Sequence, residues 1–328
     1  MNTKPKIWME SIIQIATLER LHDFAEVVRG SSPESIQGCD AAVISARPDV
    51  NGAWLDAAGP TLKVVARPGI GVDNITIADA SARGILVMNT PDAPTESTAE
   101  HTIALMMAIA KRVVMADIHL RAGNAMAAGI NRNMLKGTEM KGKTLGIIGL
   151  GRIGRRVAEM AAFGIRMNVI GFDPYAKPGS VPGVEFVDSI DTLLARADFV
   201  SLNAALTNET RKSFNEARLR QMKRGAYLIN CSRGGVIDEA ALYKVLVDGH
   251  LAGAALDVFD PEPPLPDNPL LTLPNVVVTM HIASFTEVGT DSMGNGVVDQ
   301  LAQLFRGERP DNLLDGKAWP GRAASIVN

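Results

Sequence analysis

The hydrophobic pattern of residues 1–90 alternates short apolar runs with amphipathic stretches. Segments near Leu18–Val28, Asn51–Ala58 and Ile77–Arg83 predict helices or helical turns. The apolar runs between them predict buried strands, at Ile7–Met9, Ala41–Ser45, Leu62–Ala66 and Ile85–Met88. Because strands that alternate with helices are typical of a parallel sheet covered on both faces, this region predicts a first α/β unit.

A loop with two prolines, Pro91 and Pro94, follows this first unit. Ser97 and Glu100 then have the spacing of a capping box, and the sequence beyond them is rich in Ala and Met. We therefore expect one long helix from Ser97 to about Arg121. Its length and position suit a connector between domains, which predicts a domain boundary near Ser97.

The stretch Lys141–Asp173 carries the most informative pattern of the chain. Thr144–Ile148 predicts a buried strand, Arg155–Phe163 has helical spacing, and Met167–Phe172 predicts a second strand with Asp173 at its end. Between the first strand and the helix lie three glycines in a GxGxxG arrangement: Gly149, Gly151 and Gly154. A chance glycine turn is the alternative, but strand, glycines, helix, second strand and acid all fall in the order that a dinucleotide site requires.

Each part of this fingerprint has a physical role in dinucleotide binding. The first glycine permits a tight turn, the second lets the backbone approach a pyrophosphate, and the third lets helix and strand pack closely. The helix N-terminus offers unpaired N–H groups and a positive dipole end to the phosphates. Asp173 would accept hydrogen bonds from ribose hydroxyls and repel a 2′-phosphate, so we expect NAD rather than NADP.

The strand and helix alternation continues to residue 281. Helices are predicted at Ser213–Met222 and Asp238–Val247, and the further strands at Phe199–Leu202, Ala226–Asn230, Ala254–Val258 and Val276–Met280. With the first two strands these give a six-stranded doubly wound sheet. The glycine fingerprint begins only at Gly149, far from the start of the chain. The simplest architecture therefore inserts a cofactor domain, residues 98–284, into a second domain made of residues 1–97 and 285–328.

Composition and charge narrow the classes of function. The chain has 328 residues, which suggests about two domains, and a net charge of −3 implies no general attraction to nucleic acid. The longest apolar run, Ile103–Ala110, is too short to cross a bilayer, so no membrane association is expected. The two cysteines, Cys39 and Cys231, argue against a disulfide framework and a four-cysteine zinc site, and they fit a reducing cytoplasm.

Three polar residues follow predicted strands of the second half. Arg233 lies beside two glycines and can bind a carboxylate through two parallel hydrogen bonds, although a surface arginine in a turn is the alternative. His281 leaves a buried strand at the edge where ligands bind, so it is either a general acid or base or a hydrogen-bonded core histidine. Glu262 lies in a proline-rich loop, where it either pairs with His281 or is a solvated acid.

A fourth candidate site follows the predicted strand Leu62–Ala66. Gly69, Ile70 and Gly71 place two glycines one residue apart, which leaves backbone N–H groups open to an anion. An ordinary strand-to-helix turn explains the same residues equally well.

Together these stretches resemble the D-isomer-specific 2-hydroxyacid dehydrogenase family, most of all its phosphoglycerate dehydrogenase branch. The resemblance runs from about Leu62 to about Glu287 and includes ARPGIGVDNI, GKTLGIIGLGRIGRRVA, INCSRGGVIDEAAL, GAALDVFDPEPP and TMHIAS. It implies a Rossmann cofactor domain inserted into a flavodoxin-like substrate domain. It also implies a triad in which Arg233 holds the substrate, His281 exchanges a proton with it, and Glu262 keeps His281 protonated.

The resemblance assigns further residues by position. Asp257 is expected near the nicotinamide amide, and Gly69, Ile70 and Gly71 near the substrate carboxylate. The other implied cofactor contacts are Arg152, Ile153, Ala204, Cys231 and Ser284. The family also implies a homodimer built through the cofactor domain, and no metal is expected.

The resemblance implies an NAD-dependent enzyme that interconverts a small 2-oxo acid and a D-2-hydroxy acid. Candidate substrates are 3-phosphoglycerate, glycerate or hydroxypyruvate, and glyoxylate, and the alternative is an NAD(H)-sensing, corepressor-like protein on the same fold. The chain departs from the family in three places. Asp92-Ala93-Pro94 replaces a commoner glycine-containing turn. Asn203-Ala204-Ala205 stands where many relatives have His-x-Pro. Many phosphoglycerate enzymes have an arginine near the position of Ser45, whereas the nearest here is Arg47, which weakens the case for a phosphorylated substrate.

Overall fold

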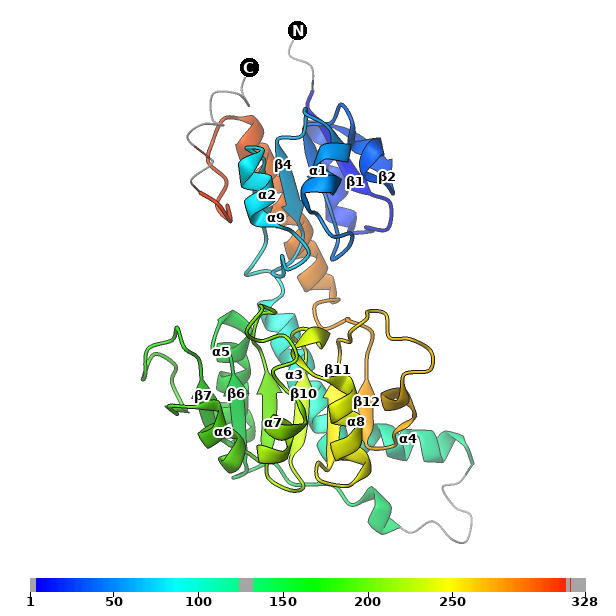
Figure 1. Ribbon diagram of the computed structural model, residues 1–328, viewed down its shortest axis with the longest axis vertical. Coiled ribbons are helices and arrows are strands. Elements are labelled where there is room, and N and C mark those ends of the chain that lie inside the picture. The colour runs from blue at the N-terminus through cyan, green and yellow to red at the C-terminus, as the bar shows by residue number, and fades with distance from the viewer. Residues whose placement is uncertain (1–3, 124–131, 317–318, 320–328) are drawn as a thin grey trace. The chain divides into compact units, whose positions relative to one another are not determined.

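The computed structural model describes residues 4–123, 132–316 and 319 (Figure 1). The chain forms two compact units, one made of Met1–Pro94 and Phe285–Asn328, the other of Thr95–Ser284. The sequence placed the corresponding boundaries after residue 97 and before residue 285. That these units act as the substrate domain and the cofactor domain stays a prediction.

The discontinuous unit contains a five-stranded parallel sheet in the order β2-β1-β3-β4-β5. Its strands are β1 (Lys6–Glu10), β2 (Glu26–Gly30), β3 (Ala41–Val43), β4 (Val64–Arg67) and β5 (Leu86–Asn89). Its helices are η1 (Ala16–Asp23), η2 (Pro33–Ile36), α1 (Gly52–Ala58), α2 (Ile77–Ala82) and α9 (Glu287–Phe305). This strand order is that of the flavodoxin-like doubly wound fold.

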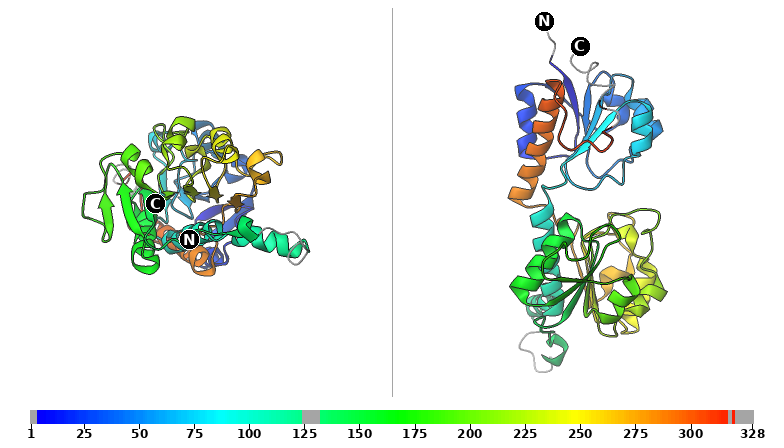
Figure 2. Two further views of the ribbon diagram at one scale, coloured as in Figure 1. Left: turned by 90° about the horizontal axis from the view of Figure 1, so that it is seen from below. Right: turned by 90° about the vertical axis from the view of Figure 1, so that its left-hand side faces the viewer.

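Helices cover both faces of this sheet, as the right-hand view of Figure 2 shows. On one face η1 and α9 pack against β1, β3 and β4, with Leu21 and Leu301 fully buried. On the other face lie α1 and α2, with Trp54 and Ala80 in the core. Gln300 of α9 also donates a hydrogen bond to the backbone oxygen of Asn89 at 2.9 Å. The C-terminal helix is therefore an integral part of the N-terminal sheet.

The expected helix over Leu18–Val28 is only partly present. The helical turn η1 ends at Asp23, and the chain then forms the edge strand β2, which pairs with β1 in parallel register. Because β2 is partly exposed, its residues lack the apolar run that marks a buried strand. Pairing with the neighbouring strand decides its conformation.

The unit Thr95–Ser284 contains seven parallel strands in the order β12-β11-β10-β9-β6-β7-β8. They are β6 (Thr144–Ile148), β7 (Asn168–Phe172), β8 (Val184–Phe186), β9 (Phe199–Leu202), β10 (Tyr227–Asn230), β11 (Gly253–Leu256) and β12 (Val276–Val278). This is the Rossmann order with one more strand than the sequence predicted. The additional strand, β8, is a three-residue strand at the sheet edge. The strand order reverses between β6 and β9, where ligands of such sheets bind.

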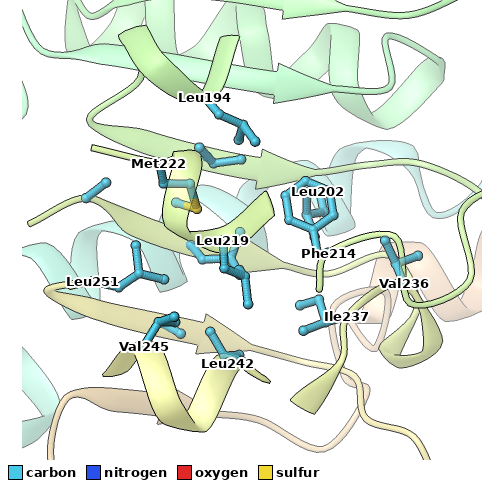
Figure 3. Close-up of a cluster of buried hydrophobic side chains, with 14 of the residues drawn as sticks. Leu194, Leu202, Phe214, Leu219, Met222, Val236, Ile237, Leu242, Val245 and Leu251 are labelled. Atoms are coloured by element: carbon cyan, nitrogen blue, oxygen red, sulfur yellow. The ribbon is translucent and has the colours of Figure 1, made fainter. Parts of the chain in front are cut away.

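Two apolar layers cover this sheet, and alternate residues of each strand face opposite layers. One layer comprises α3 (Thr95–Ala110), α5 (Arg152–Glu159) and the π-helical segment η4 (Met160–Ile165). The other comprises α6 (Ile190–Arg196), α7 (Glu216–Gln221) and α8 (Glu239–Val247). Figure 3 shows this second layer, where Leu219 of α7 and Leu242 of α8 lie over the sheet. The short helices η3 (Arg132–Leu135), η5 (Gly234–Val236) and η6 (Pro269–Thr272) complete the unit.

The single long helix expected from Ser97 to Arg121 is wrong in two respects. The helix α3 begins at Thr95, so Ser97 lies inside its first turn and is no capping residue. It ends at Ala110, and a second helix, α4 (Val113–Arg121), follows Arg112, whose φ of 56° is left-handed. A left-handed residue interrupts the α-helical hydrogen-bond ladder, and periodicity alone does not reveal it.

No helix in the described part of the chain combines the length and the apolarity that crossing a membrane requires.

Candidate active site

The turn between β6 and α5 depends on two of its three glycines. Gly149 has a φ of +93°, and a Cβ added there would lie 2.7 Å from the backbone oxygen of Asn203. A Cβ on Gly154 would lie 2.0 Å from the backbone oxygen of Gly149. A Cβ on Gly151 would meet nothing within 4 Å. The fold therefore requires glycine at 149 and 154, whereas the bare backbone at Gly151 leaves room for a ligand.

The residues around this turn fit a dinucleotide. Gly151 is the N-cap of α5 and offers no side chain to cap the first helical N–H groups, such as that of Ile153. Such N–H groups favour phosphate oxygens. The open edge at Gly151 and the uncapped helix together form a cradle of the kind that a pyrophosphate fills.

Asp173 ties the end of β7 to the glycine turn. Its Oδ2 accepts a hydrogen bond from the backbone N–H of Leu150 at 2.7 Å. Its Oδ1 accepts from the N–H groups of Tyr175 at 2.7 Å and Ala176 at 3.1 Å. These contacts fix the carboxylate beside the turn. A carboxylate has about four acceptor positions, so it can accept ribose hydroxyls in addition.

Arg233 lies just after β10, in a turn held by Asn230. The side-chain amide of Asn230 donates to the backbone oxygen of Arg233 at 2.9 Å, and its Oδ1 accepts from the N–H of Ser232 at 3.0 Å. A Cβ on Gly234 would lie 2.0 Å from the backbone of Phe259. The Arg233 turn therefore packs directly against the loop that carries Glu262.

Glu262 and His281 form a direct side-chain pair. Oε1 of Glu262 is hydrogen bonded to Nδ1 of His281, and both side chains are 31% exposed. His281 lies three residues beyond β12, and its φ of 57° is left-handed. With Nδ1 committed to the carboxylate, Nε2 is the ring nitrogen that can exchange a proton with a ligand.

Asp257 lies at the end of β11 with only 1% of its surface exposed. Its Oδ1 accepts hydrogen bonds from the Thr279 hydroxyl at 2.6 Å and the Ile282 N–H at 2.9 Å, and its Oδ2 accepts from the Ala283 N–H at 2.9 Å. Burial acts to raise the pKa of Asp257, but hydrogen bonds from His101, Thr279 and these amides outweigh it and hold the pKa below its usual range. A contact between Asp257 and the nicotinamide stays a prediction.

The other residues assigned to the cofactor follow the carboxyl ends of strands in the same sheet. Ala204 follows β9 beside the glycine turn, since its N would lie 3.0 Å from a Cβ on Gly149. Cys231 follows β10, and burial raises the pKa of its thiol to about 12, so the thiol is protonated at neutral pH. Ser284 is half-buried at the end of this unit. Cys231 and Cys39 are both free thiols.

The turn after β4, in the other unit, is fixed by Asn89 and Thr90 at the end of β5. The N–H of Gly69 donates to Oγ1 of Thr90 at 2.7 Å, and the Ile70 oxygen accepts from the side-chain amide of Asn89 at 2.9 Å. Of the three amides expected to bind an anion, that of Gly69 is thus committed to the protein. The amides of Ile70 and Gly71 donate to no acceptor within residues 4–123, 132–316 and 319.

Two residues near His281 were missed by the sequence analysis. His101 lies within the helix expected from Ser97 to about Arg121 and Thr279 within the predicted strand Val276–Met280, and neither position suggested a role in the site. In the structure Nε2 of His101 lies 3.1 Å from Oγ1 of Thr279. Because 178 residues separate them, spacing gives no signal for this pair. Among the described residues, no group of three or more His, Cys, Asp or Glu side chains is arranged to hold a metal ion.

Comparison with known proteins gives consistent results. Residues 103–283 match the model of the "D-isomer specific 2-hydroxyacid dehydrogenase, NAD binding domain". The chain is 44% identical over 286 residues to D-3-phosphoglycerate dehydrogenase of Methanocaldococcus jannaschii, covering 86% of this chain and 53% of that one. It is also 44% identical over 284 residues to glyoxylate reductase of Korarchaeum cryptofilum, covering 86% of this chain and 84% of that one.

Among solved structures, the chain is similar to an NADPH-dependent glyoxylate/hydroxypyruvate reductase from Sinorhizobium meliloti in complex with NADP and malonate. The TM-score is 0.86 at 31% identity, covering 97% of this chain and 98% of that one. The chain thus spans about half the length of the Methanocaldococcus relative and most of the length of the other two.

Proposed function

Since this chain belongs to the D-isomer specific 2-hydroxyacid dehydrogenases, we propose that it interconverts a small 2-oxo acid and a D-2-hydroxy acid with NAD(H). The observation that carries the proposal is the hydrogen bond between Glu262 and His281. The Arg233 turn packs against the same loop. An anion-binding guanidinium and a carboxylate-supported imidazole are the two groups that reduction of a 2-oxo acid needs.

The unit Thr95–Ser284 binds the cofactor in this proposal. Gly151 and the α5 N-terminus take the pyrophosphate, and Asp173 accepts the adenosine ribose hydroxyls. Ala204, Cys231, Asp257 and Ser284 lie toward the nicotinamide end. NAD(H) supplies or accepts the hydride when it is bound. The carboxylate of Asp173 disfavours a 2′-phosphate, which supports NAD over NADP.

The triad acts on the substrate as follows. Arg233 binds the 2-oxo acid through paired hydrogen bonds. In the other unit, the amides of Ile70 and Gly71 are candidate donors to a carboxylate. In reduction, Nε2 of His281 donates a proton to the carbonyl oxygen, and in oxidation the same nitrogen accepts it. Glu262 is hydrogen bonded to Nδ1 and so fixes the orientation of the ring.

The experiment that tests this function is a screen of NADH oxidation over glyoxylate, hydroxypyruvate, pyruvate and 3-phosphohydroxypyruvate, with His281→Ala as the control. We expect turnover with at least one 2-oxo acid, and the order of kcat/KM identifies the substrate. NADH binding without turnover on the whole panel would refute the enzymatic role and favour a cofactor-sensing protein.

We further propose a homodimer that forms through the unit Thr95–Ser284. The support is α4, which has no buried residue, while Val113, Ile118 and Leu120 are 55–63% exposed. A helix with such an apolar surface gains stability from a partner surface. Light scattering should give twice the chain mass, and Ile118→Asp combined with Leu120→Asp should give monomers. A monomeric wild type at working concentration would contradict this.

The free thiols of Cys39 and Cys231 support a reducing, cytoplasmic setting.

A further inference from the structure

A chain of hydrogen bonds connects helix α3 with the segment that carries His281. Nε2 of His101 lies 3.1 Å from Oγ1 of Thr279, and Thr279 Oγ1 lies 2.6 Å from Oδ1 of Asp257. Asp257 in turn accepts the N–H groups of Ile282 and Ala283, each at 2.9 Å. All of these residues belong to the unit Thr95–Ser284.

The direction of each hydrogen bond follows from the chemistry of the groups. The Thr279 hydroxyl has one proton, and Asp257, held ionised by its environment, can only accept. Thr279 therefore donates to Asp257 and has only acceptor capacity left for His101. Nε2 of His101 must then carry a proton and donate it. The order of donation runs from His101 to Thr279 to Asp257. Nε2 of His101 also lies 3.6 Å from Oδ1 of Asp257, so the same N–H group faces the carboxylate directly.

Asp257 holds His281 and the two residues after it through consecutive amides. Its backbone oxygen accepts the His281 N–H at 2.7 Å, while its carboxylate accepts those of Ile282 and Ala283. His281 has a left-handed φ of 57°, which a non-glycine residue adopts at a cost of about 1 kcal/mol or more. Three amides bound to one buried residue offset this cost. The orientation of the imidazole toward Glu262 depends on that backbone conformation.

We propose that Thr279 and His101 are positioning residues for His281. They fix the rotamer of the Asp257 carboxylate, and the carboxylate then holds the backbone of residues 281–283 in the conformation that aims the imidazole. The assignment of catalytic work to His281 rests on the proposed function. Along the sequence, the network joins the two ends of this unit. His101 lies in α3, which begins at the first residue of the unit, and Ala283 is the residue before its last.

The test compares Thr279→Val, which keeps the shape and loses the hydroxyl, with Thr279→Ser, which keeps the hydroxyl. His101→Leu and His101→Gln form a second pair, since glutamine retains an N–H donor. Thr138→Val is the matched control. Its hydroxyl lies 3.1 Å from that of Tyr227 in the same unit.

Steady-state kinetics should separate positioning from stability. Thr279→Val should lower kcat about 10- to 100-fold, in the range expected for misalignment of a reacting group by up to 1 Å, with little change in the substrate KM. Thr279→Ser and His101→Gln should restore most of kcat. Thr138→Val should lower the melting temperature without lowering kcat. A normal kcat in both Thr279→Val and His101→Leu would overturn the proposal.

A second readout does not need a substrate. With ¹⁵N-labelled histidine and assignment by His281→Ala, the Nδ1 resonance of His281 reports its hydrogen bond to Glu262. In the wild type, Thr279→Ser and Thr138→Val, this resonance should be at one position, and in Thr279→Val it should shift. An unshifted resonance in Thr279→Val would overturn the positioning role. Failure of the wild type to turn over any 2-oxo acid would instead refute the proposed function and leave this result standing.

Discussion

Nδ1 of His281 is hydrogen bonded to Oε1 of Glu262, which lies 19 residues earlier in the chain. The glutamate comes from the loop after β11, and the histidine from the segment after β12. Because β11 and β12 are neighbouring parallel strands, the segments that follow them both begin at the carboxyl ends of the strands. The pair fixes which ring nitrogen is open to a substrate.

Replacement of His281 removes the proton donor. His281→Ala should lower kcat by roughly 10²–10⁴-fold, the usual contribution of general acid–base catalysis. NAD affinity should change little, because the proton is needed only as the carbonyl oxygen gains charge. Steady-state kinetics and a fluorescence titration with NADH measure the two effects. A kcat near that of the wild type would remove the histidine from the mechanism.

Glu262→Gln should lower kcat, because a neutral amide holds the imidazole of His281 less firmly than the carboxylate that is hydrogen bonded to Nδ1. Glu262→Ala, which removes this hydrogen bond entirely, should lower kcat further. The substrate KM should change little in both variants, since Glu262 acts only through His281. Steady-state kinetics of the two variants beside the wild type measure the effect. A kcat equal to that of the wild type in both variants would contradict the role of the pair.

Arg233→Lys keeps the positive charge and loses the two-pronged geometry. A hydrogen bond to a charged group contributes about 1.5–3 kcal/mol, so kcat/KM should fall roughly 10- to 150-fold. KM should rise because carboxylate binding weakens, and kcat should fall because the carbonyl is misaligned. Unchanged KM in this variant would show that the substrate carboxylate binds elsewhere.

The glycine turn permits a matched pair of variants. Gly154→Ala places a Cβ against the backbone oxygen of Gly149 and should lower the free energy of unfolding by about 1–3 kcal/mol. Gly151→Ala meets open space at a negative φ and should leave the melting temperature nearly unchanged. It should nevertheless weaken NADH binding, because the methyl group occupies the edge that the pyrophosphate approaches. NADH binding of wild-type strength in Gly151→Ala would contradict the assignment.

Asp257 should make stability depend on acid pH. Its pKa is lower in the folded chain than its ordinary value, because hydrogen bonds from His101, Thr279 and two amides outweigh burial. The stabilisation is therefore complete above the unfolded pKa of about 3.9 and is lost as the pH falls through the lower folded value. Urea unfolding from pH 3 to 7 should show Asp257→Asn less stable by about 1–3 kcal/mol at neutral pH. The difference should shrink toward pH 3, and a constant difference would contradict the argument.

Strong local patterns made much of this fold predictable. The β6–α5–β7 region follows from buried apolar strands and obligatory glycines, so local and tertiary preferences agree there. The edge strands β2 and β8 were missed because partly exposed residues carry little periodic signal. The break at Arg112 was missed because one left-handed residue leaves the apolar pattern intact.

Local sequence identifies the site only as separate residues, and the pairing of Glu262 with His281 followed from the family resemblance alone. Arg233, Glu262 and His281 stand out by residue type and by their place after strands, but sequence spacing does not pair them. The sheet order brings the last two together. His101 and Thr279 escaped notice because a buried hydrogen bond between two distant polar residues has no signature in the local sequence.

The position of α9 has a consequence for biosynthesis. This helix closes one face of the N-terminal sheet, with Leu301 and Leu304 in its core, yet it is made only after the whole of Thr95–Ser284. At about 5–20 residues per second, the part of that apolar face beneath α9 stays uncovered for roughly 10–40 s, although η1 already packs beside it. Meanwhile the unit Thr95–Ser284 emerges as one continuous segment. During translation, the nascent chain thus holds a second unit that can fold and a first one that still lacks its closing helix.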